Sequence, residues 1–235
     1  MTDNIIHLQP AFILKQRQYR ESSLIIDVFT QDFGKVSLVA KGVRKTKSKT
    51  AGLLQPFIPL NLSYLGRGEL KTLTHVELAK PYLQLTGLSL YCGFYVNELI
   101  ACLLLTEDPH PEVFNLYENC LTDLLKSDQI EATLRLFELD LIEAIGYGLQ
   151  LAYDLQHHKT LSPEARYYFD IEQGPIESPE GHFSGQTLIS LQTRTLEDPK
   201  ILYEAKLLMR HVINHYLHGK PLKSRAVINQ IIKHL

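Results

Sequence analysis

The chain has 235 residues, of which 45% are hydrophobic and 21% are charged, which are ordinary proportions for a soluble globular protein. No apolar run approaches the roughly 20 residues that a membrane span needs, and the first residues lack the basic and apolar regions of a secretory signal. The three cysteines form no CxxC pair, so neither a disulfide framework nor a four-cysteine zinc site is expected. These features argue against a membrane protein and favour a cytoplasmic one.

Charge is distributed in blocks along the chain. Residues 1–80 contain 12 Lys and Arg against 6 Asp and Glu, residues 81–199 contain 5 against 19, and residues 200–235 contain 7 against 1. Two basic segments around an acidic one favour a polyanionic partner such as nucleic acid. Chance segregation of charges onto solvated faces is the alternative.

The first 80 residues predict a small β-barrel. They contain five short runs rich in Ile, Val, Leu, Phe and Thr, separated by glycine and proline turn signals. These runs are Ala11–Leu14, Ser22–Thr30, Lys35–Ala40, Phe57–Leu65 and Leu70–Leu78. Five strands in so short a segment match an OB-fold, the commonest barrel of this size that binds nucleic acid, with an SH3-like barrel as the alternative.

Residues 81–235 predict a helical domain with a small irregular insertion at about 150–184, so the fold class is α+β. Apolar residues recur at helical spacing in five segments, and a short sixth helix is expected after Pro221. The five are Leu88–Leu105, Pro111–Lys126, Ile130–Ile145, Ser184–Gln192 and Asp198–Leu217. In the insertion, residues 166–171 are expected to form a strand with residues 181–183 as its return.

No catalytic motif is present. The chain lacks a phosphate-binding loop, a dinucleotide fingerprint, a serine-hydrolase elbow and an HExxH zinc motif. His211 and His215 have the i, i+4 spacing of a zinc pair, but no nearby acid or cysteine completes a site, and a basic helix surface is the simpler interpretation. The chain is therefore predicted not to be an enzyme and to hold no metal or cofactor.

The segment after the third predicted strand is strongly basic. Five cations lie within nine residues, spaced mainly by Gly, Ser and Thr: Lys41, Arg44, Lys45, Lys47 and Lys49. Long cationic side chains on such a loop suit contact with phosphates without base readout, whereas a purely solvated loop is the alternative. Arg20, Arg67 and Lys71 are added as DNA contacts, because closure of the barrel would let these turns flank one groove.

A family resemblance rests on a series of short segments that follow one another at the right spacing over nearly the whole chain. They are Ala11–Leu14, Tyr19–Leu24, Val39–Arg44, Gly52–Phe57, Gly66–Leu73, Tyr95–Leu99, Leu134–Leu139, Gly146–Gly148 and Gly219–Arg225. Each segment alone is ordinary, but the series is specific. It resembles RecO, the bacterial family of recombination mediators and DNA-annealing proteins.

The resemblance implies an N-terminal OB-fold, a helical body and a zinc-finger-like insertion. It also implies binding to single- and double-stranded DNA, strand annealing, partnership with RecR, and contact with the acidic C-terminal tail of single-strand-binding protein. Together these activities help load RecA onto coated strands, without nucleotide hydrolysis and in association with the nucleoid. The alternative is a helical protein-interaction scaffold whose barrel is purely structural.

The insertion departs from the family pattern. Many family members carry four cysteines there, whereas this chain has none between residues 152 and 185. No structural zinc is therefore expected, and aromatic and apolar residues such as Tyr167, Tyr168 and Phe183 are expected to hold the insertion together. The three cysteines, Cys92, Cys102 and Cys120, are predicted to be buried in helices as small apolar residues.

Two further sites are predicted outside the barrel. Lys220, Lys223 and Arg225 flank Pro221, and this basic helix start is expected to bring DNA phosphates to its backbone amides, unless it neutralises the acidic middle of the chain. The resemblance implies that the tail of single-strand-binding protein ends in phenylalanine with a free carboxylate. Arg135 and Leu139 are predicted to receive it, because arginine suits the carboxylate and an apolar side chain suits the ring. A salt bridge from Arg135 to a glutamate of the same helix is the alternative.

Overall fold

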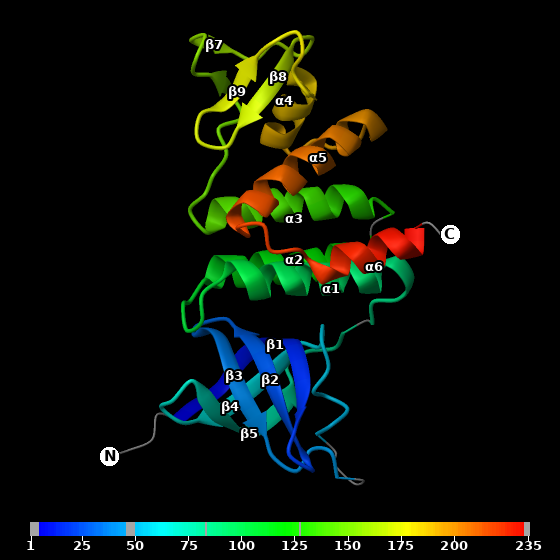
Figure 1. Cartoon of the computed structure of the whole chain (residues 1–235). Helices are drawn as coiled ribbons and strands as arrows, with labels where there is room; N and C mark the ends of the chain where they lie inside the picture. The colour runs from blue at the N-terminus through cyan, green and yellow to red at the C-terminus, as the bar shows by residue number, and fades with distance from the viewer. Residues whose placement is uncertain (1–4, 46–49, 83, 127, 233–235) are drawn as a thin grey trace. The chain divides into compact units, whose positions relative to one another are not determined.

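A computed structural model describes residues 5–45, 50–82, 84–126 and 128–232 (Figure 1). The chain forms two compact units, which are described separately below. Unit 1 comprises residues 1–125 and 222–235, and unit 2 comprises residues 126–221. None of the described helices is long and apolar enough to cross a bilayer.

Unit 1 contains the predicted barrel. Its five strands are β1 (Ile5–Tyr19), β2 (Ser23–Thr30), β3 (Gly34–Ala40), β4 (Leu60–Leu65) and β5 (Leu70–Leu78). They close in the order β1-β2-β3-β5-β4, with β3 and β5 parallel and the other neighbours antiparallel. This arrangement is an OB-fold, as the sequence predicted.

Strand β1 is much longer than predicted, because it pairs twice. Residues 5–11 pair with β4 and residues 11–19 pair with β2, so this one strand closes the barrel. Its last third, Lys15–Gln18, is exposed and polar and therefore gave no apolar signal.

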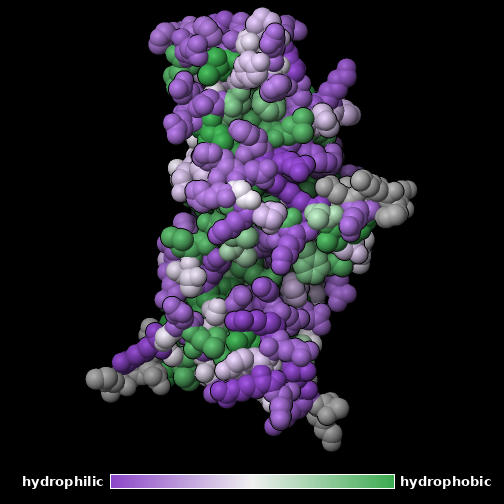
Figure 2. All heavy atoms as spheres, in the orientation of Figure 1, coloured by the Kyte–Doolittle hydropathy of each residue, from purple (hydrophilic) through white to green (hydrophobic). Residues whose placement is uncertain are grey.

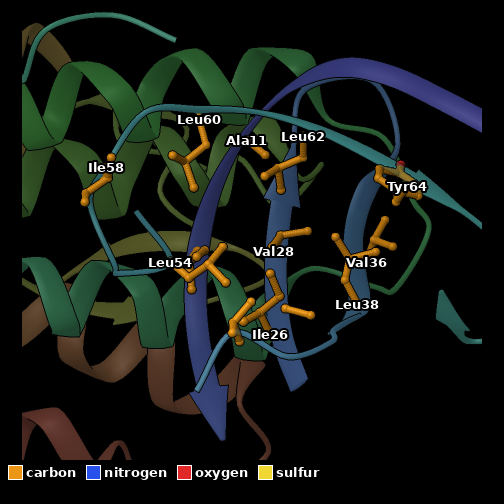
Figure 3. Close-up of a cluster of buried hydrophobic side chains, with 13 residues drawn as sticks. Ala11, Ile26, Val28, Val36, Leu38, Leu54, Ile58, Leu60, Leu62 and Tyr64 are labelled. Atoms are coloured by element: carbon orange, nitrogen blue, oxygen red, sulfur yellow. The ribbon is translucent and has the colours of Figure 1, made fainter. Parts of the chain in front are cut away.

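The core of the barrel follows the period-2 alternation of its strands. This alternation places buried side chains inside the barrel, including Ile26, Val28, Val36 and Leu38, and these pack with Leu54 and Leu62 (Figure 3).

Three helices belong to the same unit as the barrel: α1 (Gly87–Leu103), α2 (Pro111–Lys126) and α6 (Lys223–Ile232). Asn97 of α1 donates from its amide nitrogen to the carbonyls of Ile13 (3.3 Å) and Leu14 (3.1 Å), where the register of β1 shifts. The Tyr117 hydroxyl of α2 donates to the Asn97 carbonyl oxygen at 2.6 Å. The backbone carbonyls at the bulge in β1 thereby find hydrogen-bond donors inside the unit.

Aromatic side chains continue the core from the barrel to α2. The Phe12 ring of β1 lies 5.5 Å from the Phe114 ring and 5.0 Å from the Tyr117 ring, and Phe29 of β2 contacts the same two rings. The composition of the chain changes near residue 80, but the compact unit continues to residue 125 because these contacts cover the outside of β1 and β2.

Unit 2 contains α3 (Ile130–Ala144), α4 (Gly185–Thr193) and α5 (Pro199–Tyr216) together with five short strands. The strands are β6 (Tyr153–Asp154), β7 (Lys159–Thr160), β8 (Arg166–Asp170), β9 (Gly174–Glu177) and β10 (Phe183–Ser184). The predicted return is confirmed, since Phe183 pairs with Tyr167. Strand β9 was not predicted because its Gly174–Pro175 start has the composition of a turn.

One burial prediction, that of Cys102, is wrong. Cys92 and Cys120 are buried, but Cys102 is exposed, although its spacing from Leu99 places it on the apolar side of α1. Spacing along a helix does not reveal where the covering partner ends, and the last turn of α1 is exposed at residues 101 and 102. In the insertion, Tyr167 and Phe183 are buried, whereas Tyr168 is 38% exposed and contacts the His182 ring.

Candidate nucleic-acid interface

Arg20 and Arg44 meet at one end of the barrel. The Arg44 guanidinium donates to the carbonyls of Arg20 and Glu21, both at 3.3 Å, and the Arg44 amide donates to the Ser22 carbonyl at 2.9 Å. These bonds tie the segment that follows β3 to the β1–β2 turn. The Arg20 guanidinium lies 5.1 Å from the centre of the Tyr19 ring, an arrangement that holds it over an aromatic face.

The same end of the barrel carries Lys41 and Lys45, and both lysines are exposed. Arg20, Lys41, Arg44 and Lys45 are referred to below as the cationic end. Lys47 and Lys49, the other two predicted contacts, lie outside the described residues. Hydrophilic residues cover much of the lower part of the barrel on the face seen in Figure 2.

Arg67 and Lys71 do not join the cationic end. Arg67 is exposed on the turn between β4 and β5, which projects to the left in Figure 1, whereas the segment after β3 descends at the lower right. Lys71 pairs with Leu38 inside the barrel wall, and its ammonium forms an ion pair with Glu107. The Lys71 side chain is only 12% exposed, so these turns do not flank a single groove.

The start of α6 binds a carboxylate of its own unit. The amides of Lys223 and Ser224 donate to the two oxygens of Glu98 at 2.9 and 2.8 Å, and the Ser224 hydroxyl donates to Glu98 as well. The prediction that these amides receive DNA phosphates is therefore wrong, because Glu98 takes the place of the phosphate. The side chain of Lys223 is exposed, so its own role stays a prediction.

Arg225 and Lys220 differ in their surroundings. The Arg225 guanidinium donates to the Tyr95 hydroxyl at 3.3 Å and lies 5.6 Å from the centre of that ring. Lys220 is exposed and belongs to unit 2.

Sequence reasoning missed Glu98 as the partner of α6. A signal was present, because Leu222, the residue before the helix, has no side-chain oxygen with which to cap it.

Arg135 and Leu139 are both buried in α3. The Arg135 guanidinium forms an ion pair with Glu138 at 2.5 Å, and Arg135 and Glu138 are only 7% and 1% exposed. Leu139 is 2% exposed. Binding of a peptide tail at these two residues therefore requires a local rearrangement of α3 side chains, and that role stays a prediction.

Polar contacts, rather than cysteines, surround the strands of the insertion. The fully buried carboxylate of Asp154 accepts from the amides of His157 and Glu177 and from the His157 ring, at 2.7 to 2.9 Å. Burial alone would raise the pKa of Asp154, but these hydrogen bonds outweigh it and lower the pKa to about 2. Among the described residues, no three His, Cys, Asp or Glu side chains are grouped so as to hold a metal ion.

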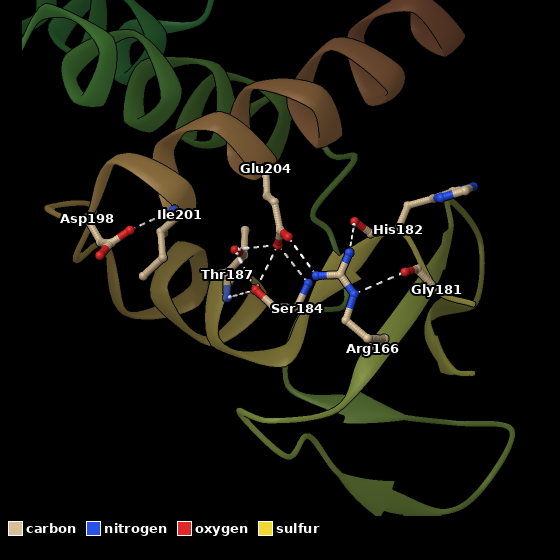
Figure 4. A network of polar contacts seen from close by, with 8 residues as sticks. All are labelled: Arg166, Gly181, His182, Ser184, Thr187, Asp198, Ile201 and Glu204. Carbon is tan, nitrogen blue, oxygen red and sulfur yellow. Dashed lines mark hydrogen bonds and ion pairs between the residues drawn. The ribbon is translucent and has the colours of Figure 1, made fainter. Parts of the chain in front are cut away.

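Glu204 of α5 holds a second polar network in unit 2 (Figure 4). One of its oxygens accepts from the Ser184 amide, the Ser184 hydroxyl and the Thr187 hydroxyl, and the other accepts from Arg166 at 2.7 Å. Arg166 also donates to the carbonyls of Gly181 and His182. Burial would raise the pKa of Glu204, but the donors that surround it lower that pKa.

The comparisons with known proteins agree with this architecture. The family described as "Recombination protein O N terminal" matches residues 2–82, and "Recombination protein O C terminal" matches residues 84–226. The chain is 42% identical over 222 residues to "DNA repair protein RecO" of Methylococcus capsulatus, covering 94% of this chain and 92% of that protein. It is 43% identical over 229 residues to the protein of the same name from Nitrosococcus oceani, covering 95% and 93%. The chain belongs to the RecO family of DNA repair proteins.

Proposed function

We propose that this chain binds single- and double-stranded DNA, anneals complementary strands, and helps load RecA onto strands coated with single-strand-binding protein. It acts by binding rather than by catalysis, in the cytoplasm with the nucleoid, and RecR is its partner. Family membership and the OB-fold support this proposal.

The observation that carries the DNA-binding part is the cationic end of the barrel. Three exposed cations, Arg20, Lys41 and Lys45, surround the turn that Arg44 ties in place. Unit 1 contains 15 Lys and Arg against 12 Asp and Glu, whereas unit 2 contains 9 against 14. A phosphate backbone is therefore attracted to unit 1 and repelled by unit 2, which favours the barrel as the main DNA-binding surface.

A charge-matched pair of variants tests this assignment. Arg20, Lys41 and Lys45 are replaced together by Ala in the full chain, while Arg44 is kept because its guanidinium supports the turn. The salt dependence of affinity for duplex DNA is expected to flatten, by up to about 0.9 in logarithmic slope for each phosphate that the variant no longer neutralises. A second version adds Lys47→Ala and Lys49→Ala.

The control removes the same number of charges from unit 2, through Lys200→Ala, Lys206→Ala and Arg210→Ala. Its slope is expected to stay that of the unaltered protein, and both variants are expected to keep the melting temperature within a few degrees. An unchanged slope in both barrel variants would show that the barrel is only structural, and equal flattening in the barrel variant and the control would show that the barrel is not the main DNA-binding surface.

A further inference from the structure

Strand β5 has an open edge beside the cationic end. Its parallel pairing with β3 stops at Val39–Thr72, although β5 continues to Leu78 and pairs with β4 along its other edge. Among the described strands, none pairs with residues 73–78 on the side of β3. Alternate residues of a strand direct their amides and carbonyls to the same edge, so this stretch offers backbone donors and acceptors to one further strand.

A pocket of about 180 Å³ lies along this edge and belongs entirely to unit 1. Residues 73–76 of β5 form one wall, and Ala40, Lys41 and Val43 contribute to the other. Ala40 and Val43 are buried in the barrel core, so the surface that the pocket offers to a ligand is mainly polar. A polar groove along a strand edge suits the backbone of an extended chain, which packs about 4.8 Å from its neighbour, better than a helix about 10–12 Å wide.

The charges around the groove favour an acidic ligand. None of the eight residues that line the pocket is acidic, whereas Lys41 is among them and its side chain is exposed. Lys45 adds a second exposed cation just beyond the groove. The nearest acid along β5 is Glu77, and its carboxylate is engaged by the Asn61 amide at 3.2 Å and the His75 ring at 3.1 Å.

We propose that an extended, acidic peptide segment of a partner protein adds to the open edge of β5 as a further strand. Its backbone forms hydrogen bonds with residues 73–76, and its carboxylates lie at Lys41 and Lys45. Main-chain hydrogen bonds give affinity in this mode of recognition, and the side chains give specificity. The inference goes beyond the proposed DNA binding and does not depend on it. Because Lys41 and Lys45 belong to the cationic end, such a peptide competes with DNA for them.

The experiment uses the full chain and a short fluorescent peptide in which valine and glutamate alternate, a pattern typical of strands. The unaltered protein is expected to bind this peptide at least about tenfold more tightly than a version with lysine in place of glutamate. A third version carries a methyl group on every backbone amide, so it keeps the carboxylates and loses its backbone donors. Its affinity is also expected to be lower by at least about tenfold, because more than one hydrogen bond is lost.

Thr74→Asp and Thr74→Asn locate the bound peptide. Position 74 lines the pocket on an exposed part of β5, and the two substitutions differ only in charge. Thr74→Asp is expected to weaken the glutamate peptide at least about fivefold relative to Thr74→Asn, because like charges then face each other, with equal melting temperatures. Hydrogen exchange at residues 73–76 of the unaltered protein is expected to slow when the peptide binds.

Equal affinity for the methylated and unmethylated peptides overturns the proposal, because binding then does not use backbone pairing. No binding of the glutamate peptide, equal affinity of the two Thr74 variants, or unchanged exchange at residues 73–76 overturns it as well. If Thr74→Asp weakens oligothymidylate and not the peptide, the groove serves DNA, and the proposal also fails. All of these outcomes leave the proposed function standing, since it is tested separately by the salt dependence of DNA affinity.

Discussion

At the scale of single residues, Asp154 combines complete burial with ionisation. Three donors surround its carboxylate, and two of them come from His157, three residues along the chain. The folded-state pKa of about 2 lies below the value of about 3.9 in an unfolded chain. The carboxylate therefore stabilises unit 2 above about pH 4, and this contribution is lost as the pH falls towards 2.

Replacement of Asp154 by Asn tests this argument. The variant is expected to lose about 2 kcal/mol of unfolding free energy at pH 7, because an amide cannot accept all three hydrogen bonds, and to be less sensitive to acid than the parent between pH 4 and pH 2. Denaturant unfolding at pH 7 and pH 3 measures both effects. Glu180→Gln, at an exposed position of the same insertion, is expected to change neither.

Arg135 presents a choice between a structural and a binding role, because its guanidinium already pairs with buried Glu138. If the guanidinium also receives the terminal carboxylate of the single-strand-binding protein tail, Arg135→Ala is expected to weaken a fluorescent tail peptide about tenfold, the usual scale for a charged hydrogen bond. Annealing of naked strands is expected to remain intact, and annealing of coated strands to be impaired.

Glu138→Gln is the matched control for Arg135, since it breaks the same ion pair and keeps the guanidinium. Its peptide affinity is expected to equal or exceed that of the parent. If both variants lose peptide affinity and melting temperature together, the pair is purely structural. Unchanged peptide affinity in Arg135→Ala would exclude this position as the receptor.

At the scale of elements, Glu204 joins α5 to β10 and to the start of α4. Its carboxylate accepts from Ser184 and Thr187, while Arg166 links it to β8 (Figure 4). The N-terminus of α5 has its own cap, since Asp198 accepts from the Lys200 and Ile201 amides. Loss of Glu204 should therefore loosen the insertion more than it loosens α5.

Glu204→Ala leaves several partly buried donors without their acceptor and is expected to cost about 2 kcal/mol of unfolding free energy. Hydrogen exchange is expected to accelerate at residues 181–187 and to change little at the centre of α5. Glu197→Ala, an exposed acid just before α5, serves as the control. Uniform acceleration across unit 2 would contradict a local role.

The insertion also allows a prediction about metal dependence. The insertion has no cysteine, and hydrogen bonds to Asp154 and Glu204 hold its strands together. Purified protein is therefore expected to contain far less than one zinc per chain, and a chelator is expected to leave its melting temperature unchanged. Stoichiometric zinc, or a chelator-dependent fall in melting temperature, would show that His157, His158 or His182 binds a metal.

At the scale of the whole molecule, segments from both sides of unit 2 in the sequence belong to one compact unit. Helix α6 packs with α1, Leu222 is 6% exposed, and Glu98 accepts from residues 223 and 224 across 125 or more positions of sequence. Unit 1 is thus completed by residues that follow unit 2 along the chain.

A chain that ends at residue 221 is expected to lose roughly 3 kcal/mol of unfolding free energy in unit 1, because Leu222 is no longer buried and the hydrogen bonds to Glu98 are absent. Denaturant unfolding of the truncated and full chains measures the loss. Val227→Ala, which alters a 43% exposed side chain of α6, is expected to have little effect. A truncated chain of unchanged stability would show that α6 contributes nothing to the unit.

The sequence by itself determined the class of the barrel, the bounds of five helices to within about two residues, the presence of a short sixth helix after Pro221, and membership of the RecO family. Apolar spacing, turn residues and helix starts such as Pro111 and Pro199 are local signals, and they suffice because each element is fixed largely by its own residues. The basic segment after β3 was also evident from the sequence alone.

Only the tertiary structure decided which basic residues lie close together and which of them are occupied by partners within the protein. Arg44 reaches carbonyls 23 and 24 residues away, Lys71 pairs with Glu107, and the α6 amides bind Glu98. Local spacing carries no information on such contacts, because each one exists only after the barrel has closed or the helices have packed. A cation in the sequence is therefore a candidate, and the long-range partner that it finds on folding determines whether its charge remains available to DNA.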